Sequence, residues 1–298
     1  MINSNMAPQG MAVTPHHLAS QSALAVLREG GNAIEAMVAA AATIAVVYPH
    51  MNGLGGDGFW LIIPPNGDPI AIDASGAAGE LATLERSSAY QQIPHRGPQA
   101  ANWGCGRGPG DTVWMGVIDN NGLAVSFIQS IYHEFGSGVL LSTTGIIWQN
   151  RGASFSLDPK HLLALAPGKQ PFHTLNPAAA RLTDGRTLVY GAMGGDGQPQ
   201  TQAAVFIRHI VQGLPLQQAI TALRWLLGRT WGENSDSLKL EARFGAETLD
   251  YLRQRGHQVE LLPDFSEVVG HAGAIVRHRN GMLEGAFDPR SNGSATGY

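Results

Sequence analysis

One β-hairpin signal constrains the fold of this chain more than any other stretch of its sequence. Residues 112–129 contain two apolar runs separated by an Asn-Asn-Gly sequence at residues 120–122. An Asn-Gly pair between two apolar runs is the strongest short-range sign of a hairpin. A stretch rich in glycine and proline, residues 104–110, precedes the hairpin. Thr112 therefore opens the first strand directly after a loop.

A threonine in this position has two interpretations. If the Asp111–Thr112 peptide bond were cut, the free α-amino group of Thr112 could act as general base for the hydroxyl of the same residue, which activates a weak nucleophile. A β-branched residue is also a good strand former with no further role. The local pattern leaves both interpretations open.

Helical and extended periodicities alternate along the rest of the chain. They predict helices over residues 17–29, 33–47, 82–90, 199–213, 215–227 and 246–255. They predict strands over residues 59–63, 70–73, 146–150, 187–190, 238–244, 259–262, 274–277 and 282–287. Strands grouped with helices outside them indicate an α+β layered domain. With 298 residues, 44% of them hydrophobic, the chain can bury a substantial core in one large domain or two small ones.

Charge, hydropathy and cysteine content exclude several kinds of partner and site. The net charge of −4 gives no basis for binding nucleic acid or an anionic membrane. The apolar run at residues 37–47 is too short to span a bilayer. Residues 1–15 carry no secretory signal, so we expect a cytoplasmic protein. The single cysteine, Cys105, excludes an intramolecular disulfide and a cysteine-based zinc site.

Short motifs give no reason to expect a cofactor or a metal. Gly53, Gly55 and Gly58 spell G-x-G-x-x-G, but this dinucleotide fingerprint should follow a strand and open a helix. Here the motif follows a predicted helix and opens a predicted strand. The chain has no G-x-S-x-G sequence, and His133-Glu134 is not followed by a histidine at zinc-binding spacing.

Three blocks of sequence resemble the γ-glutamyltransferase family, whose members are N-terminal-nucleophile hydrolases. The blocks are residues 30–59, residues 112–150, and a third made of residues 171–177, 191–195 and 288–298. They occur in the family's order and cover most of the chain. The resemblance implies a four-layer αββα sandwich. It also implies a precursor that cuts itself at Asp111–Thr112 into two associated fragments, residues 1–111 and 112–298, that together form one domain. Whether such heterodimers pair further stays open.

The resemblance also implies a catalytic set. Thr112 would be the nucleophile, and Ser130 matches a second hydroxyl residue that assists it. Gly194-Gly195 matches the glycine pair whose backbone N–H groups form the oxyanion hole. Two adjacent glycines suit this role because they allow close backbone approach and unusual dihedral angles. Ser130 as a plain sheet residue, and Gly194-Gly195 as a plain turn, remain alternatives.

Substrate specificity is inferred from positions where the chain departs from the transferases. The resemblance implies five substrate-binding residues: Tyr132, Asn150, Arg151, His173 and Thr174. Arg151 and Ser154 stand where transferases hold the substrate α-ammonium with Gln and Asp. Exchanging a carboxylate for a guanidinium favours a bound carboxylate instead, although Arg151 as a surface residue is an alternative. The chain looks most like the oxamate amidohydrolase branch, which implies hydrolysis of oxamate to oxalate and ammonia in purine-derived nitrogen use.

The segment between Asp73 and Thr112 is much shorter than the resemblance implies. The family has a longer, mostly helical lobe here, and Ala74 and Ser75 replace an arginine that binds the substrate carboxylate in transferases. A natural deletion and an omitted segment between about Gln99 and Gly106 are both compatible with the sequence. Three hypotheses follow: an amidase for small acids, a γ-glutamyl hydrolase or transferase, and an inactive remnant. We also expect exposed apolar surface where the lobe is absent.

Overall fold

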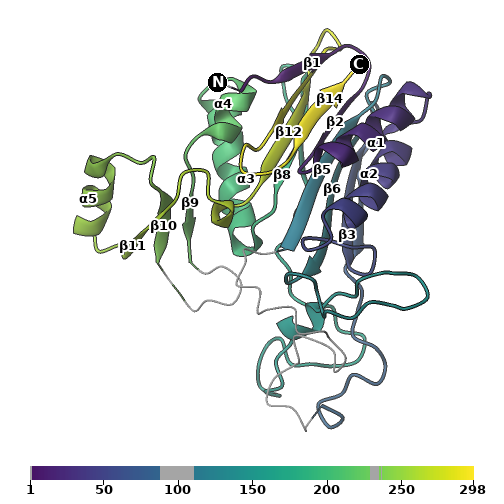
Figure 1. The fold of residues 1–298 in the computed structure, drawn as a ribbon, viewed down its shortest axis with the longest axis vertical. Helices are drawn as coiled ribbons and strands as arrows, with labels where there is room; N and C mark the ends of the chain where they lie inside the picture. The colour runs from purple at the N-terminus through teal and green to yellow at the C-terminus, as the bar shows by residue number, and fades with distance from the viewer. Residues whose placement is uncertain (1, 88–110, 229–234, 236) are drawn as a thin grey trace.

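Two antiparallel sheets form the centre of the protein (Figure 1). The computed structural model describes residues 2–87, 111–228, 235 and 237–298. The order in the six-stranded sheet is β14 (Ser294–Gly297), β2 (Met11–Thr14), β5 (Asp111–Ile118), β6 (Ala124–Tyr132), β3 (Asp57–Ile63) and β4 (Ile70–Ala74). The order in the five-stranded sheet is β1 (Asn5–Ala7), β13 (Leu283–Phe287), β12 (Ala272–Arg277), β8 (Thr187–Ala192) and β7 (Ala178–Arg181).

Helices pack on each sheet, and the two sheets pack on each other. Helices α1 (His17–Arg28) and α2 (Ala33–Val47) contact the six-stranded sheet. Helices α3 (Gln198–Phe206) and α4 (Leu216–Thr221) contact the five-stranded sheet. Three apolar clusters fill the spaces between the helices and sheets and between the two sheets. The predicted α+β class is confirmed.

The predicted hairpin is β5–β6, and its turn is fixed to the start of α2. Asp119 accepts hydrogen bonds from the backbone N–H groups of Asn121 and Leu123 through Oδ1, which closes the turn. Its Oδ2 accepts the N–H of Ala33 at 3.0 Å, one of the donors that a helix start leaves unpaired. Asn32 and Glu35 form a capping box at the same end of α2. One carboxylate therefore joins hairpin and helix.

Trp114 sets the spacing between the two sheets. Its ring lies in the cluster between them, and its Nε1 donates to Ser126 Oγ at 2.9 Å. Gly191 on β8 and Gly273 on β12 face the ring: an added Cβ would lie 2.0 Å and 2.4 Å from Trp114 ring atoms. Glycines on the opposite sheet therefore make room for the indole.

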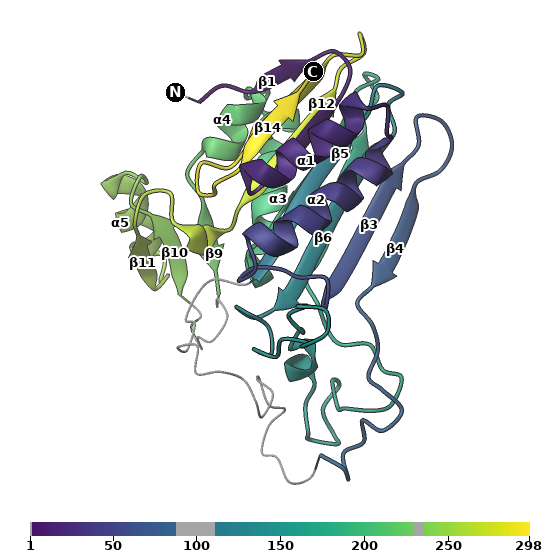
Figure 2. The same ribbon diagram turned by 45° about the vertical axis from the view of Figure 1, so that its right-hand side comes forward.

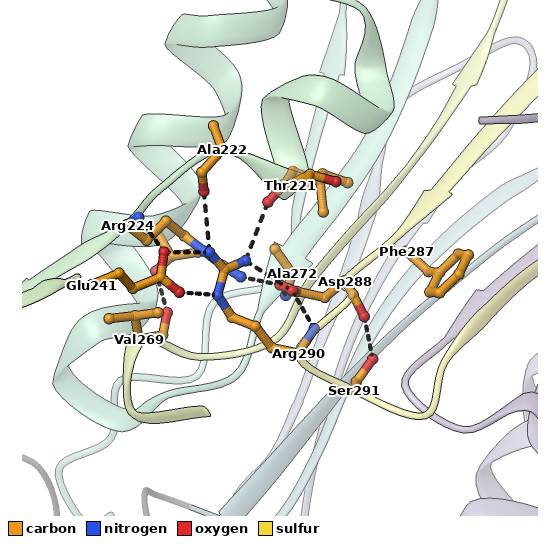
Figure 3. Close-up of polar contacts among 12 residues, drawn as sticks. Thr221, Ala222, Arg224, Glu241, Val269, Ala272, Phe287, Asp288, Arg290 and Ser291 are labelled. Carbon is orange, nitrogen blue, oxygen red and sulfur yellow. Dashed lines mark hydrogen bonds and ion pairs between the residues drawn. The ribbon is translucent and has the colours of Figure 1, made fainter. Parts of the chain in front are cut away.

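A small third sheet is attached to the C-terminal region through buried ion pairs (Figure 3). Its elements are β9 (Trp225–Leu227), β10 (Leu238–Glu241), β11 (Val259–Leu262) and the neighbouring helix α5 (Ala246–Gln254). Arg290 donates to both carboxylate oxygens of Glu241 at 2.7 Å, and Arg224 pairs with Asp288. Asp288 also accepts the N–H of Ala272, at the start of β12, at 2.6 Å. These contacts tie β10 to the five-stranded sheet.

The two strands at one edge of the six-stranded sheet, β3 and β4, lie beside α2 and are not covered by it (Figure 2). We call this region the uncovered face, and it comprises β3, β4 and a groove of about 420 Å³ beside α2. Val38, Leu54 and Trp60 line the groove, and Ile72 pairs with Trp60 across the sheet. All five residues of the edge strand β4 are exposed. Exposed apolar surface, expected from the short middle segment, is therefore present here.

Four secondary-structure predictions need correction. Residues 82–87 form turns, and the rest of the helix predicted over 82–90 lies outside the described residues. Residues 146–150 make isolated bridges through Ile147 and Trp148 rather than a strand. The helix predicted over 215–227 ends at Thr221, because its last residues pair with β10 as β9. The short strands β1, β2, β7 and β14 were not predicted.

The uncovered face predicts self-association. An exposed, apolar edge strand is a template for pairing with another chain. We expect light scattering to show a mass above the 31.5 kDa monomer that grows with protein concentration. Ile72→Lys should return the mass to that of the monomer, because a charge then lies at the centre of β4. Leu162→Lys, in an exposed loop, is the control and should not. A wild-type monomer at all concentrations would refute this prediction.

Candidate active site

Three polar residues lie side by side across the six-stranded sheet. Asp57 on β3 pairs with Ser130 on β6, and Ser130 pairs with Thr112 on β5. Alternation along each strand places their side chains on the face that carries Phe59, Ile128 and Trp114, which pack between the two sheets. We call these three residues the polar row. A hydrogen bond of 3.0 Å joins the hydroxyl oxygens of Thr112 and Ser130, and the assisting role of Ser130 stays a prediction.

The peptide bond predicted to be cut lies at an irregularity of the sheet. Asp111 pairs with Tyr132 whereas Thr112 pairs with Ser130, so Ile131 is an extra residue in β6. Such bulges re-aim side chains and are common beside active sites. Tyr132 has φ of 78°, which is unusual for a bulky residue. Its N–H donates to Ser130 Oγ at 3.0 Å.

Arg151 reaches the polar row from the short helix η1 (Arg151–Ser154). Its Nε and Nη2 donate to Asp57 Oδ2 at 2.8 and 2.6 Å, and Nη2 lies 3.4 Å from Ser130 Oγ. Its guanidinium carbon lies 4.2 Å from the centre of the Tyr132 ring, in cation–π geometry. Arg151 is buried, with 3% of its surface exposed, so the alternative of a surface arginine is wrong.

Asp57 is the site residue that the sequence analysis did not name. It is fully buried, and burial raises its pKa to about 6 in spite of the opposing charge of Arg151. Its Oδ1 has no hydrogen-bond partner within the described ranges. Its position two residues before Phe59 could have indicated it. Alternation along the strand places both side chains on the same face of the sheet, and the structure shows that this face also carries Ser130.

Asn150 holds Arg151 in place through the backbone. Its Oδ1 accepts the N–H of His133 at 3.0 Å, and its own N–H donates to the carbonyl of Ile131 at 3.2 Å. Ile131 lies at the end of β6 and His133 directly follows that strand, so the residue before Arg151 is anchored beside the polar row. In this structure the Asn150 side chain positions the backbone, and its predicted contact with substrate stays a prediction.

His173 and Thr174 lie in the segment before β7. The His173 ring centre is 4.5 Å from that of Phe59, and its Nδ1 accepts the N–H of Leu175 at 3.2 Å. Burial lowers the His173 pKa, which nearby Asp73 partly offsets. His173 therefore lies close to the strands that carry Asp57. Thr174 is half-buried beside it, and its role in binding stays a prediction.

Gly194 and Gly195 follow the end of β8. Both have positive φ, 129° and 52°, in the region that favours glycine, and both are buried. Trp114 faces Gly191, and Gly116 faces Ile275, which pairs with Val189 on β8. The start of β5 and the end of β8 therefore lie at the same end of the sheets. The glycine pair is thus brought toward the nucleophile end of β5, and its role as oxyanion hole stays a prediction.

Space beside Arg151 is limited. A cavity of about 120 Å³ is lined by Arg151 together with Ser75, Gln149 and Phe155. Arg151 Nη1 makes no hydrogen bond to any described residue, whereas Nε and Nη2 are used by Asp57. Across residues 2–87, 111–228, 235 and 237–298, no group of three or more acidic, histidine or cysteine side chains could hold a metal. In the same ranges, no helix combines the length and hydrophobicity needed to cross a membrane.

Comparison with protein families gives a match over nearly the whole chain. The family model described as Gamma-glutamyltranspeptidase matches residues 19–102 and 89–298. The match is therefore in two pieces, and their residue ranges overlap at 89–102, in the shortened middle segment.

Sequence similarity to named proteins agrees with the family match. The chain is 44% identical to the Oxamate amidohydrolase proenzyme of Klebsiella pneumoniae, in an alignment of 528 positions that spans all of both proteins, and the 298 residues fill only part of those positions. It is 48% identical over 187 residues to the Glutathione hydrolase-like YwrD proenzyme of Bacillus subtilis, and 30% identical over 195 residues to the Glutathione hydrolase proenzyme of Escherichia coli. These two alignments cover 63% and 60% of this chain but 36% and 31% of the relatives.

Solved structures agree on the fold. The crystal structure of cephalosporin acylase from Bacillus halodurans aligns with all of this chain and 97% of its own, with a TM-score of 0.85 and 21% identity. At that identity the likeness shows the fold alone.

Arg151→Gln should destabilise the protein in a pH-dependent way. Removing one partner of a buried ion pair typically costs about 3–5 kcal/mol, because a buried charge is left uncompensated. Asp57 can avoid this cost by binding a proton, and its pKa, already near 6, rises further without Arg151. A carboxyl group with a raised pKa in the folded state stabilises less as pH increases through that pKa. The loss in free energy of unfolding should therefore be larger at pH 8 than at pH 5.

Urea denaturation at the two pH values measures this difference. Arg186→Gln is the control, because Arg186 pairs with Asp184 at the surface, where an ion pair contributes less than about 1 kcal/mol. Equal losses at pH 5 and pH 8 for Arg151→Gln would contradict the role given to the Asp57 charge.

Proposed function

Because the chain belongs to the gamma-glutamyltranspeptidase family, we propose that it is an amidohydrolase that cuts the amide bond of a small acid such as oxamate, with Thr112 as nucleophile. The products would be oxalate and ammonia. The observation that carries the proposal is the pair of contacts that links Thr112 through Ser130 to the Arg151 guanidinium. The name of the Klebsiella relative supports the choice of substrate.

The chemistry begins with the precursor. Attack by the Thr112 hydroxyl on the carbonyl of Asp111 moves the acyl group from the Thr112 nitrogen to its oxygen, which frees the α-amine. Water then hydrolyses this ester, which releases the Asp111 carboxylate and restores the Thr112 hydroxyl. That amine takes the hydroxyl proton as the oxygen attacks the substrate amide carbon. The N–H groups of Gly194 and Gly195 would stabilise the oxyanion, a type of contact worth about 3 kcal/mol per donor. Ammonia leaves with a proton, and water hydrolyses the ester to free the acid.

The geometry favours a short substrate. Arg151 Nη2 lies 3.4 Å from Ser130 Oγ, which lies 3.0 Å from Thr112 Oγ1. A carboxylate held at the guanidinium edge and an amide carbon at Thr112 therefore belong to a molecule in which the two groups are close. Oxamate has them on adjacent carbons, whereas a γ-glutamyl group separates them by several bonds. The carboxylate would be bound by Nη1 of Arg151, which Asp57 does not use.

We also propose the finer architecture and organisation. The helix–sheet, sheet–sheet and sheet–helix contacts support a four-layer αββα sandwich of the N-terminal-nucleophile type. Pairing of β2 with β5, and of β1 with β13, supports a single domain made by residues 1–111 and 112–298 after cleavage. The proenzyme names of the relatives support two fragments from one precursor. Cytoplasmic location and a role in purine-derived nitrogen use complete the proposal.

One observation favours each of two alternative functions. A γ-glutamyl hydrolase is favoured by the similarity to the Glutathione hydrolase proenzyme of Escherichia coli. An inactive remnant is favoured by the many positions of the Klebsiella alignment that this chain does not fill.

Processing separates an active precursor from a remnant. Intact-mass measurement on freshly purified wild-type protein should show two fragments cut before Thr112. Thr112→Ala should remain one chain, because the hydroxyl that starts the acyl shift is absent. The control is Thr143→Ala, which removes the hydroxyl of an exposed loop threonine and should be cut normally. An uncut wild-type chain would support the remnant instead.

Substrate preference separates the two enzyme hypotheses. We expect ammonia release from oxamate with a kcat/KM about 100-fold above that for a γ-glutamyl anilide. This ratio corresponds to about 3 kcal/mol, the scale of one charge-assisted hydrogen bond to the carboxylate. Coupled ammonia detection and anilide absorbance measure the two rates. Preference for the anilide would exclude the oxamate assignment.

A further inference from the structure

We propose that Asp57 is a positioning residue for the nucleophile: by fixing Arg151, it holds Ser130 Oγ as the acceptor toward which the Thr112 hydroxyl points. The inference rests on the proposed function, because it gives Asp57 a part in the reaction of Thr112. It concerns a residue two strands away from the nucleophile that touches neither Thr112 nor the reacting atoms.

The first step of the argument is the direction of the guanidinium. Asp57 Oδ2 accepts from Nε and Nη2, which lie on the same edge of the planar group. Two bonds to one oxygen fix the rotation of the plane as well as its distance. In that orientation Nη2 lies within 3.4 Å of Ser130 Oγ, and the ring of Tyr132 packs against the guanidinium. Without the carboxylate, nothing on that edge would hold Nη2 toward Ser130.

The second step is the set of donors around Ser130. Its Oγ faces the Thr112 hydroxyl at 3.0 Å, the N–H of Tyr132 at 3.0 Å and Arg151 Nη2 at 3.4 Å. A serine oxygen has two lone pairs, which the Thr112 hydroxyl and the Tyr132 N–H occupy, while Arg151 Nη2 makes a longer contact on the same side. The Ser130 proton is then directed away from Thr112, and the Thr112 proton is directed toward Ser130. The lone pairs of Thr112 Oγ1 are thereby left for attack.

The third step is the cost of the arrangement. Asp57 is fully buried and one of its oxygens, Oδ1, has no partner in the described ranges. A buried ion pair is often no more stabilising than apolar side chains of similar volume, so stability alone gives little reason for this one. Its position at the end of the polar row gives another reason for the ion pair, which is that Asp57 orients the Arg151 guanidinium.

The test compares Asp57→Asn with wild type in the full-length chain. Asparagine keeps the shape but replaces the charged acceptor. We expect autocatalytic cleavage at Thr112, followed by intact mass over time, to slow by about 100-fold, on the scale of one lost charge-assisted hydrogen bond. In the fraction that is cut, the free α-amine takes the Thr112 proton, so kcat for oxamate should fall by a smaller factor than the cleavage rate. KM should change less than about threefold, because Asp57 does not touch the substrate.

A matched control and a second variant guard against simple misfolding. Asp119→Asn removes another buried carboxylate of the same hairpin, at the far end from Thr112, and should lower Tm but leave the cleavage rate unchanged. Arg151→Lys keeps a positive charge for Asp57 but lacks the fork that reaches both neighbours. It should fold as judged by thermal melting, and still cut slowly.

The pH profile of cleavage adds a measurement that a purely structural role would not change. Before cleavage Thr112 has no free amine, so that group does not contribute. The charged groups that act on Asp57 are Arg151 and Asp73, and His173 packs on Phe59, two residues farther along β3. The wild-type rate should fall as pH decreases through about 6, and this decline should be absent in Asp57→Asn but present in His173→Gln.

The outcomes separate this inference from the proposed function. Wild-type cleavage without oxamate turnover would refute the substrate, and Asp57 would still be tested by the cleavage rate. Asp57→Asn that cuts and turns over like wild type would overturn the inference while leaving the proposed function intact. A wild-type chain that is neither cut nor active would overturn both.

Discussion

The register between β3, β6 and β5 is the constraint on which the rest of the candidate site depends. It places Asp57, Ser130 and Thr112 in one line on one face of the sheet. A slip of one residue would turn any of these side chains to the opposite face, against α2. Uninterrupted pairing from Thr112–Ser130 to Ile118–Ala124 keeps the register fixed. The chemistry proposed for Thr112 is therefore a consequence of sheet pairing.

The sequence predicted those parts of the site that local patterns control. The Asn-Gly turn predicts the hairpin, and period-two alternation then places Ser126, Ile128 and Ser130 on one face, as the structure confirms. The pair Arg151–Asp57 joins residues 94 positions apart, so no local periodicity could indicate it. The sequence had indicated a binding role for Arg151, but not that a carboxylate of the same chain occupies two of its nitrogens.

The secondary-structure predictions failed for the same reason: pairing with other strands, and not the local pattern, decided the structure. Residues 222–227 continue a helical pattern, yet β9 forms because β10 offers an edge to pair with. The strands β1, β2, β7 and β14 are three or four residues long, too short to show a period. Partners far along the chain stabilise β1, β2 and β14, whereas β7 pairs with the adjacent strand β8. Family resemblance supplied the glycine pair and the second hydroxyl, which physical patterns alone would have left as a turn and a sheet residue.

The indole of Trp114 between Gly191 and Gly273 has a consequence for how such proteins can diverge. It works as a spacer of fixed thickness, so the distance between the two sheets is set by three residues that all lie outside the segment between residues 74 and 111. Length changes in that segment therefore leave these three residues, and the spacing that they set, unchanged. A core whose sheet spacing is set from inside can keep its geometry while connecting segments outside it lengthen or shorten in the course of evolution.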